Sequence, residues 1–166
     1  CGLPYYIGGS ISDADDLTLQ TPRSFNSRFN VSVNVLHEVT AIDPAAKTVT
    51  VKNLAGGEEF TEGYDKLILS PGAKPTLPDV PGIDNKRVFT LRTVEDTMAI
   101  HAFIEESKPK SAVIAGGGYI GIEMAENLRH LGLDVTMVQR PKQLLNTLDQ
   151  DMASFVHAKM RAEGVC

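Results

Sequence analysis

Residues 112–121 read AVIAGGGYIG, an apolar run that leads into a cluster of glycines. The run at 112–115 is typical of a strand buried within a sheet, and residues 119–131 have the pattern of a helix. A second strand is predicted at 134–138. Because strand, helix and strand follow one another with a glycine-rich turn between the first two, this part of the chain predicts an α/β fold with a parallel sheet.

The glycines have the spacing G-x-G-x-x-G, with Gly116, Gly118 and Gly121 at the glycine positions and Tyr119 and Ile120 between the last two. The first glycine would allow a tight turn, the second would let the backbone approach a pyrophosphate, and the third would let helix and strand pack closely. A phosphate placed there would face the helix N-terminus, whose free N–H groups and dipole favour an anion. A purely structural turn is the alternative, and the strand–turn–helix–strand order favours dinucleotide binding.

Gln139 and Arg140 follow the second predicted strand, where a dinucleotide site contacts the ribose. NAD sites have Asp or Glu there, about 20 residues beyond the glycines. Gln carries no charge to repel a 2′-phosphate, and Arg can pair with one. Acceptance of NADPH is therefore one hypothesis, and an ordinary exposed arginine is the alternative. Glu123 is expected in the first helical turn, where it complements the helix dipole or lines the nicotinamide pocket.

The first half of the chain has a different pattern. Thr21 and Pro22 predict the start of a short helix that reaches Phe29. The valines at 31, 33 and 35 alternate with polar residues, as in a strand. Three further strands separated by turns are predicted at 38–43, 47–52 and 59–62. Their order along the chain predicts an antiparallel meander.

Between the meander and the glycine cluster, the apolar run at 66–70 predicts a strand buried on both faces. Thr93 predicts the cap of a helix that reaches Ser107, and Asp96 stands where a capping box requires it. The linker at 108–110 is the predicted domain boundary. A last helix is predicted at 151–163, with its apolar residues on one face.

Composition excludes several classes of protein. The chain has 166 residues and a net charge of −5 without a cluster of Lys and Arg, which argues against binding to nucleic acid. No apolar run approaches the roughly 20 residues of a membrane span, and no signal peptide is visible. The two cysteines, Cys1 and Cys166, do not form a secreted disulfide framework, so a cytoplasmic location is expected. The four histidines lack the spacing of metal ligands, and no metal site is predicted.

Several segments resemble the FAD-dependent pyridine nucleotide–disulfide oxidoreductases. Residues 116–125 resemble the NAD(P)H motif of that family, and YDKLILSPGA at 64–73 resembles its second flavin motif. Residues 37–43, and Leu91-Arg92 with Asp96, also match, so the resemblance covers essentially the whole chain. It implies parts of two Rossmann-like, three-layer domains. Residues 1–107 would be the C-terminal part of an FAD-binding domain that contains the meander, and residues 108–166 the N-terminal part of an NAD(P)H-binding domain.

The first residues, CGLPYYIG, resemble the active-site segment of the branch that contains coenzyme A–disulfide reductases, NADH-dependent persulfide reductases and NADH oxidases or peroxidases. Relatives of the glutathione reductase type carry a second cysteine five positions on, where this chain has Tyr6, so an intramolecular disulfide is excluded here. The resemblance implies that Cys1 is catalytic, as a mixed disulfide with coenzyme A, a persulfide or a sulfenic acid.

The resemblance also implies roles for residues outside the cysteine segment. Val39, through its backbone, Ser70 and Gly72 would contact FAD, and Tyr119 and Glu123 would flank the nicotinamide. Hydride would pass from NAD(P)H to FAD, and the reduced flavin would reduce the cysteine centre, with a small disulfide or persulfide as substrate. The full-length protein would be a homodimer.

The chain departs from the family pattern in two respects. It has no first G-x-G-x-x-G for the ADP part of FAD and no C-terminal dimerisation domain, so it is expected to be a piece of a longer protein. Three alternatives stay open. These are an NADH oxidase or peroxidase that uses a cysteine sulfenic acid, an inactive dinucleotide-binding fragment, and an electron carrier of the ferredoxin or rubredoxin reductase type, which does not need Cys1.

Overall fold

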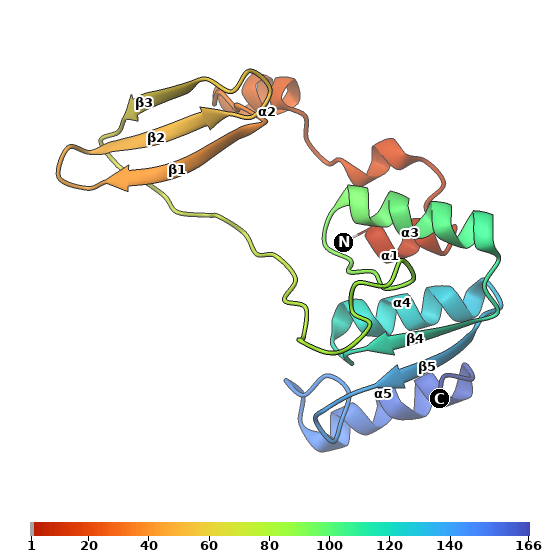
Figure 1. The fold of residues 1–166 in the computed structure, drawn as a ribbon. Coiled ribbons are helices and arrows are strands. Elements are labelled where there is room, and N and C mark those ends of the chain that lie inside the picture. The colour runs from red at the N-terminus through yellow and green to blue at the C-terminus, as the bar shows by residue number, and fades with distance from the viewer. Residues whose placement is uncertain (1) are drawn as a thin grey trace. The chain divides into compact units, whose positions relative to one another are not determined.

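The computed structural model describes residues 2–166, and the predicted catalytic residue, Cys1, lies outside the described residues. The chain divides into two compact units (Figure 1). Residues 2–18 and 74–166 form the large unit, and residues 19–73 form the small unit. No helix in the described part of the chain is both long enough and apolar enough to cross a membrane.

The small unit contains the predicted helix and the predicted meander. Helix α2, Pro22–Phe29, begins at a capping box formed by Thr21 and Ser24. Strands β1 (His37–Asp43), β2 (Thr48–Asn53) and β3 (Glu59–Gly63) form an antiparallel sheet in the order β1-β2-β3. The prediction of an antiparallel meander is confirmed.

Two strand predictions in the small unit are wrong. Residues 31–35 and 66–70 are irregular, and neither segment pairs with another strand among residues 2–166. Ile68 and Leu69 are 86% and 68% exposed, although the apolar run predicted a strand buried on both faces. An extended segment becomes a strand only when a partner satisfies its N–H and C=O groups, so alternation or apolar character alone does not make one.

The large unit is built around the predicted parallel pair. Strand β4 (Ser111–Ala115) pairs in parallel with β5 (Asp134–Val138), and helix α4 (Tyr119–His130) connects them. The remaining elements are α1 (Leu3–Ile7), the short 3₁₀ helix η1 (Ala14–Leu17), α3 (Val94–Ser107) and α5 (Gln150–Ala162). The α/β class with one antiparallel and one parallel sheet is thus confirmed.

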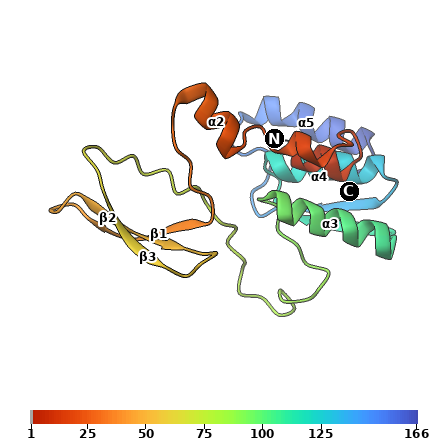
Figure 2. The same cartoon turned by 90° about the horizontal axis from the view of Figure 1, so that it is seen from above.

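A single apolar core holds the large unit together. Burial alternates along β5, where Val135 is 2% exposed while Thr136 and Val138 face outward. Helix α1 packs against both α3 and α4, and Ile7 at its end is also 2% exposed (Figure 2). The buried residues of this core are Ile7, Ile100, Met124, Ala125, Leu128, Leu133, Val135, Leu144, Met160 and Val165.

Cys166 extends the parallel sheet beyond β5. Its N–H donates to the carbonyl oxygen of Val135 at 3.0 Å, and its own carbonyl accepts from the N–H of Met137 at 2.8 Å. Bonds to residues on either side of Thr136 are the pattern of a parallel ladder. Cys166 therefore lies on the edge of β5 that β4 leaves free.

The start of α3 allows a direct test of the predicted cap. The hydroxyl of Thr93 accepts from the N–H of Asp96 at 3.2 Å, and the Asp96 carboxylate accepts from the N–H groups of Thr93 and Arg92. Thr93→Ala is expected to lower the free energy of unfolding by about 1 kcal/mol, because one N-terminal N–H of the helix loses its acceptor. Urea denaturation followed by circular dichroism measures this, and Thr93→Ser, which keeps the hydroxyl, should unfold like the wild type.

Candidate functional site

The glycine-rich turn joins β4 to α4 in a geometry that depends on two glycines. Gly116 has φ of +117°, a backbone conformation that side chains disfavour, and its N–H donates to the carbonyl oxygen of Val138 at 2.9 Å. A Cβ atom on Gly121 would overlap the carbonyl oxygen of Gly116. The first turn of α4 therefore lies against the end of β4 with no room for a side chain between them.

Gly118 differs from Gly116 and Gly121. Its lack of a side chain is not needed for packing, but it leaves the backbone open to a ligand. It is the N-cap of α4 and makes no side-chain cap, so the first N–H groups of the helix are left for another acceptor. A Cβ atom added to Gly118 would meet nothing within 4 Å. The turn therefore presents a bare backbone and a helix N-terminus at one open point, which fits the approach of a pyrophosphate.

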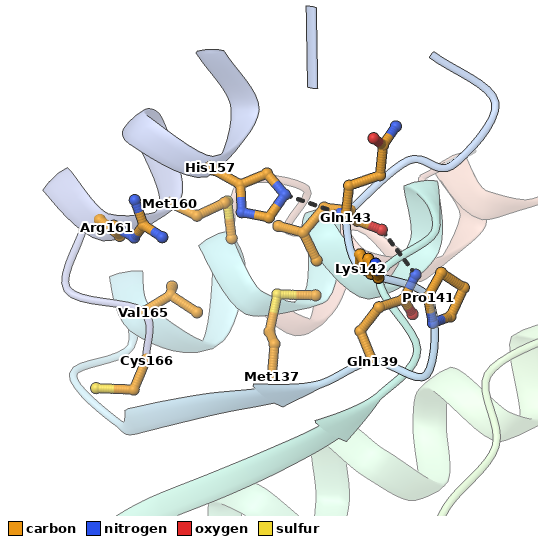
Figure 3. A pocket seen from close by; sticks show the side chains of 11 residues that line it. Met137, Gln139, Pro141, Lys142, Gln143, His157, Met160, Arg161, Val165 and Cys166 are labelled. Atoms are coloured by element: carbon orange, nitrogen blue, oxygen red, sulfur yellow. Dashed lines mark hydrogen bonds between the residues drawn. The ribbon is translucent and has the colours of Figure 1, made fainter. Parts of the chain in front are cut away.

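Both polar groups of Gly117 are bound by the segment after β5. The Gly117 N–H donates to Oε1 of Gln139 at 2.7 Å, and the Gly117 carbonyl accepts from the N–H of Leu145 at 2.8 Å. Nε2 of Gln139 in turn donates to the carbonyl of Gln143 at 3.0 Å (Figure 3). Gln139 thus holds the glycine turn, a function that its predicted role at the ribose did not include. Arg140 is exposed and adjacent to it.

The residues that open α4 are partly exposed. Tyr119 and Ile120 are 62% and 47% exposed at the start of the helix. Glu123 is the fifth residue of α4, so the expectation that it lies in the first turn is wrong. It is half-buried, and its carbonyl accepts from Nδ2 of Asn127 at 2.8 Å. A dipole role for the Glu123 carboxylate is weakened accordingly, because the dipole effect decays within the first turn.

The residues expected to contact FAD all belong to the small unit. Val39 lies in β1 just before a bulge, since Val39 opposes Val51 while Ala41 opposes Thr50. Bulges disrupt the ladder locally and are common beside functional sites. Ser70 is exposed, and Gly72 has φ of +71° in the turn that follows the apolar run. Val39, Ser70 and Gly72 are all exposed, and their contacts with FAD stay a prediction.

Helix α1 brings the cysteine segment of the sequence onto the helix of the glycine motif. It begins two residues after Cys1, and Gly8 at its end packs directly on Asn127 of α4, where a Cβ atom would overlap the amide side chain. Ile7 enters the same core as Met124 and Leu128. The rings of Tyr6 and His101 are 5.2 Å apart, which joins α1 to α3. The sequence did not indicate this packing of the two motifs.

The shifted pKa values of the described residues belong to exposed ion pairs on helices. A hydrogen bond from Lys159 and its positive charge lower the pKa of the Glu163 carboxyl, and the same contact raises the pKa of Lys159. Lys108 lowers the pKa of Glu105 in the same way. Such surface pairs contribute little to stability. The described residues contain no group of three or more His, Cys, Asp or Glu that could hold a metal ion.

Comparison with known proteins gives similarity along the whole chain. Coenzyme A disulfide reductase of Staphylococcus haemolyticus is 44% identical over 156 residues, which are 94% of this chain and 35% of that protein. Reduced CoADR-RHD of Bacillus anthracis, a crystal structure, is 48% identical with a TM-score of 0.91 over 99% of this chain and 30% of that one. The water-forming NADH oxidase of Lactobacillus brevis bound to NADH is 36% identical with a TM-score of 0.84, over 99% of this chain and 36% of that one.

The chain therefore spans about a third of the length of the curated relatives that it matches. The family model for pyridine nucleotide-disulphide oxidoreductases matches residues 1–166, which is the same region that carries the glycine turn, the meander and the cysteine segment. The chain belongs to the pyridine nucleotide-disulphide oxidoreductase family.

Proposed function

We propose that this chain is part of a flavin-dependent NAD(P)H oxidoreductase that reduces a small disulfide or persulfide, with coenzyme A disulfide as the preferred substrate and Cys1 as the redox residue. The observation that carries the proposal is the packing of α1 on α4, because it places the segment that follows Cys1 on the helix of the glycine turn. The similarity to the coenzyme A disulfide reductase of Staphylococcus haemolyticus supports the choice of substrate.

The residues of the large unit have distinct parts in this proposal. Gly118 and the N-terminus of α4 would receive the pyrophosphate of NAD(P)H, and Tyr119 and Glu123 would flank the nicotinamide. Bound FAD would supply the two-electron carrier between NAD(P)H and the cysteine, with Val39, Ser70 and Gly72 as its contacts in this chain. The thiolate of Cys1 would attack one sulfur of the substrate disulfide and release the other half as a thiol.

A single cysteine fits a substrate that itself supplies the second sulfur. Tyr6 occupies the position at which a resolving cysteine would be needed for an internal disulfide. The mixed disulfide between Cys1 and half of the substrate must therefore be resolved by electrons from the flavin. The only other cysteine of the chain, Cys166, is exposed at the edge of β5 in the large unit.

Two other functions are compatible with the same turn. An NADH oxidase would use Cys1 as a sulfenic acid, and the similarity to the Lactobacillus brevis oxidase favours this candidate. The third candidate is a dinucleotide-binding fragment without oxidoreductase activity. The visible absorption spectrum, recorded with and without added FAD and then with NAD(P)H, separates the oxidoreductases from the fragment. In the full-length protein, bound flavin that bleaches anaerobically is expected, and a full-length protein that binds NAD(P)H but never flavin would contradict the oxidoreductase proposal.

Substrate consumption then separates the two oxidoreductases. The proposed reductase is expected to consume NAD(P)H and produce two equivalents of coenzyme A thiol from each coenzyme A disulfide under nitrogen. Rapid NAD(P)H consumption that requires oxygen and ignores the disulfide would instead identify an oxidase. Thiol release is measured with a chromogenic disulfide after the NAD(P)H is exhausted.

The exposed Arg140 gives a prediction for the choice of dinucleotide. If Arg140 pairs with the 2′-phosphate of NADPH, Arg140→Glu is expected to weaken NADPH binding about tenfold or more, and to leave NADH binding within about twofold, because only NADPH carries the extra charge. Lys110→Glu is the matched control, since Lys110 lies before β4 at the opposite end of the sheet. Fluorescence titration with both dinucleotides measures the effect, and a clear NADH preference of the wild type would contradict it.

A further inference from the structure

We propose that His157 is a positioning residue that holds the glycine-rich turn in its binding shape through the segment 143–148. The inference rests on the dinucleotide binding proposed above and adds a residue that is remote from the motif in sequence. His157 lies on α5, and its Nε2 atom accepts a hydrogen bond from the N–H of Leu144 at 2.9 Å (Figure 3). Through this bond α5 holds the segment that binds Gly117.

The connection from His157 to the turn has only two steps. The N–H of Leu144 binds His157, and the N–H of the next residue, Leu145, donates to the carbonyl oxygen of Gly117 at 2.8 Å. The second link runs from Gln143, whose carbonyl accepts from the Gln139 amide that also binds the Gly117 N–H. Consecutive residues of one segment thus bind α5 on one side and the phosphate-facing turn on the other.

The segment needs such support because its backbone is strained. Leu145 has φ of +46°, a conformation that costs a non-glycine residue roughly 1–2 kcal/mol. Three bonds hold it there: the N–H of Leu145 on Gly117, the N–H of Leu148 on the Leu145 carbonyl, and the Gln143 amide on the Leu148 carbonyl. Leu144 is buried, and its side chain lies where a Cβ atom on Gly117 would be. A small displacement of the Leu144 side chain would therefore shift the backbone of the turn at Gly117.

Among the residues that hold this segment, His157 differs because its bond to Leu144 depends on the protonation state of its ring. Because Nε2 accepts a hydrogen bond, it carries no proton, and the neutral ring holds its proton on Nδ1. A protonated imidazole has two N–H donors and no acceptor, so protonation must break the bond to Leu144. Lys142 and Arg161 line the same pocket as His157, together with the thiol of Cys166, and no carboxylate is among the residues that line this pocket (Figure 3).

Two substitutions separate the acceptor from the bulk of the ring. His157→Phe keeps a ring of similar size but no acceptor, and His157→Gln keeps an oxygen acceptor at similar reach. In nitrogen-15 spectra of residues 1–166, the amide hydrogens of Leu144 and Leu145 are expected to exchange about fivefold faster or more in His157→Phe, the loss of a typical net hydrogen bond. His157→Gln is expected to restore protection, which a role in packing alone would not do.

The effect on ligand binding is measured with NADH on the same proteins. His157→Phe is expected to weaken NADH binding about fivefold, with His157→Gln within about twofold of wild type. Equal protection and equal NADH affinity in all three proteins would overturn the proposal.

Dinucleotide binding and the support of the turn by His157 can be disproved separately. If wild-type protein binds neither NADH nor NADPH while the amides of Leu144 and Leu145 respond to His157→Phe, the dinucleotide proposal is wrong and the support of the turn by His157 stands. If NADH binds and the amides do not respond, the turn is formed independently of His157. Circular dichroism of each variant checks that α5 and the rest of the large unit remain folded.

Discussion

Gly121→Ala is expected to destabilise the large unit by about 1–3 kcal/mol and to remove dinucleotide binding, because the added methyl group has no place between β4 and α4. The Cβ atom would overlap the carbonyl oxygen of Gly116, which is backbone and cannot rotate away as a side chain could. Alanine raises helix propensity by about 1 kcal/mol, which offsets only part of the cost. Either α4 moves away from β4 or the turn opens, and both changes displace the N-terminus that would bind the pyrophosphate.

Gly118→Ala is the matched substitution, three residues away in the same motif. An added methyl group meets nothing within 4 Å, and the backbone at Gly118 has φ of −81°, which alanine adopts freely. The free energy of unfolding should stay within about 1 kcal/mol of wild type. NAD(P)H binding should still fall at least about tenfold, because the methyl group occupies the approach of the pyrophosphate. If Gly118→Ala binds NAD(P)H normally, this turn does not receive the dinucleotide.

If the full-length protein is the proposed reductase, Cys1→Ser is expected to slow its reduction of coenzyme A disulfide by about 10³-fold or more, as is typical for loss of the nucleophile in covalent catalysis. Serine keeps the shape of the side chain but forms no disulfide, so the transfer of electrons to the substrate has no intermediate. Reduction of bound flavin by NAD(P)H should continue at the wild-type rate, since it precedes any chemistry at the thiol. Stopped-flow absorbance for the flavin and thiol release for the substrate measure the two steps separately.

Cys166→Ser is the control for this experiment. Cys166 is an exposed thiol at the edge of β5, and replacement should leave both steps unchanged. A Cys1→Ser protein that transfers electrons to ferredoxin or rubredoxin as fast as the wild type would identify an electron carrier of that type. The same pair of variants therefore distinguishes a disulfide reductase from a flavoprotein that does not use the cysteine.

Periodicity and capping residues predicted helices α2 to α5 and the paired strands, because each of these elements satisfies its own backbone locally or with the next segment along the chain. Helices α1 and η1 were not predicted. The meander and the β4–α4–β5 unit both join neighbours in sequence, and their bounds agree closely with the predicted ranges. The apolar run at 66–70 has the same composition as a buried strand, but its state depends on a partner strand, and composition does not say whether one is present. Ile68 at 86% exposure shows the difference.

The glycine spacing predicted the turn of the candidate site, and it did not predict what supports that turn. G-x-G-x-x-G is readable because close packing and positive φ permit only glycine at Gly121 and Gly116. The bonds of Gln139 to Gly117 and of His157 to Leu144 join residues 22 and 13 positions apart through backbone atoms, which carry no residue identity. A side chain that hydrogen-bonds to backbone atoms can pair with any residue type. Such a contact therefore has no characteristic spacing in the sequence.

The contact between α1 and α4 couples the local unfolding of residues 3–8 to that of residues 119–130. A five-residue helix is far too short to be stable alone, so α1 depends on its packing against α3 and α4. Fraying of α4 removes one of these two supports, and a ligand that stabilises α4 should therefore also restrain residues 3–8. Limited proteolysis within residues 2–10 would then report occupancy of the glycine turn, although no residue of that segment belongs to it.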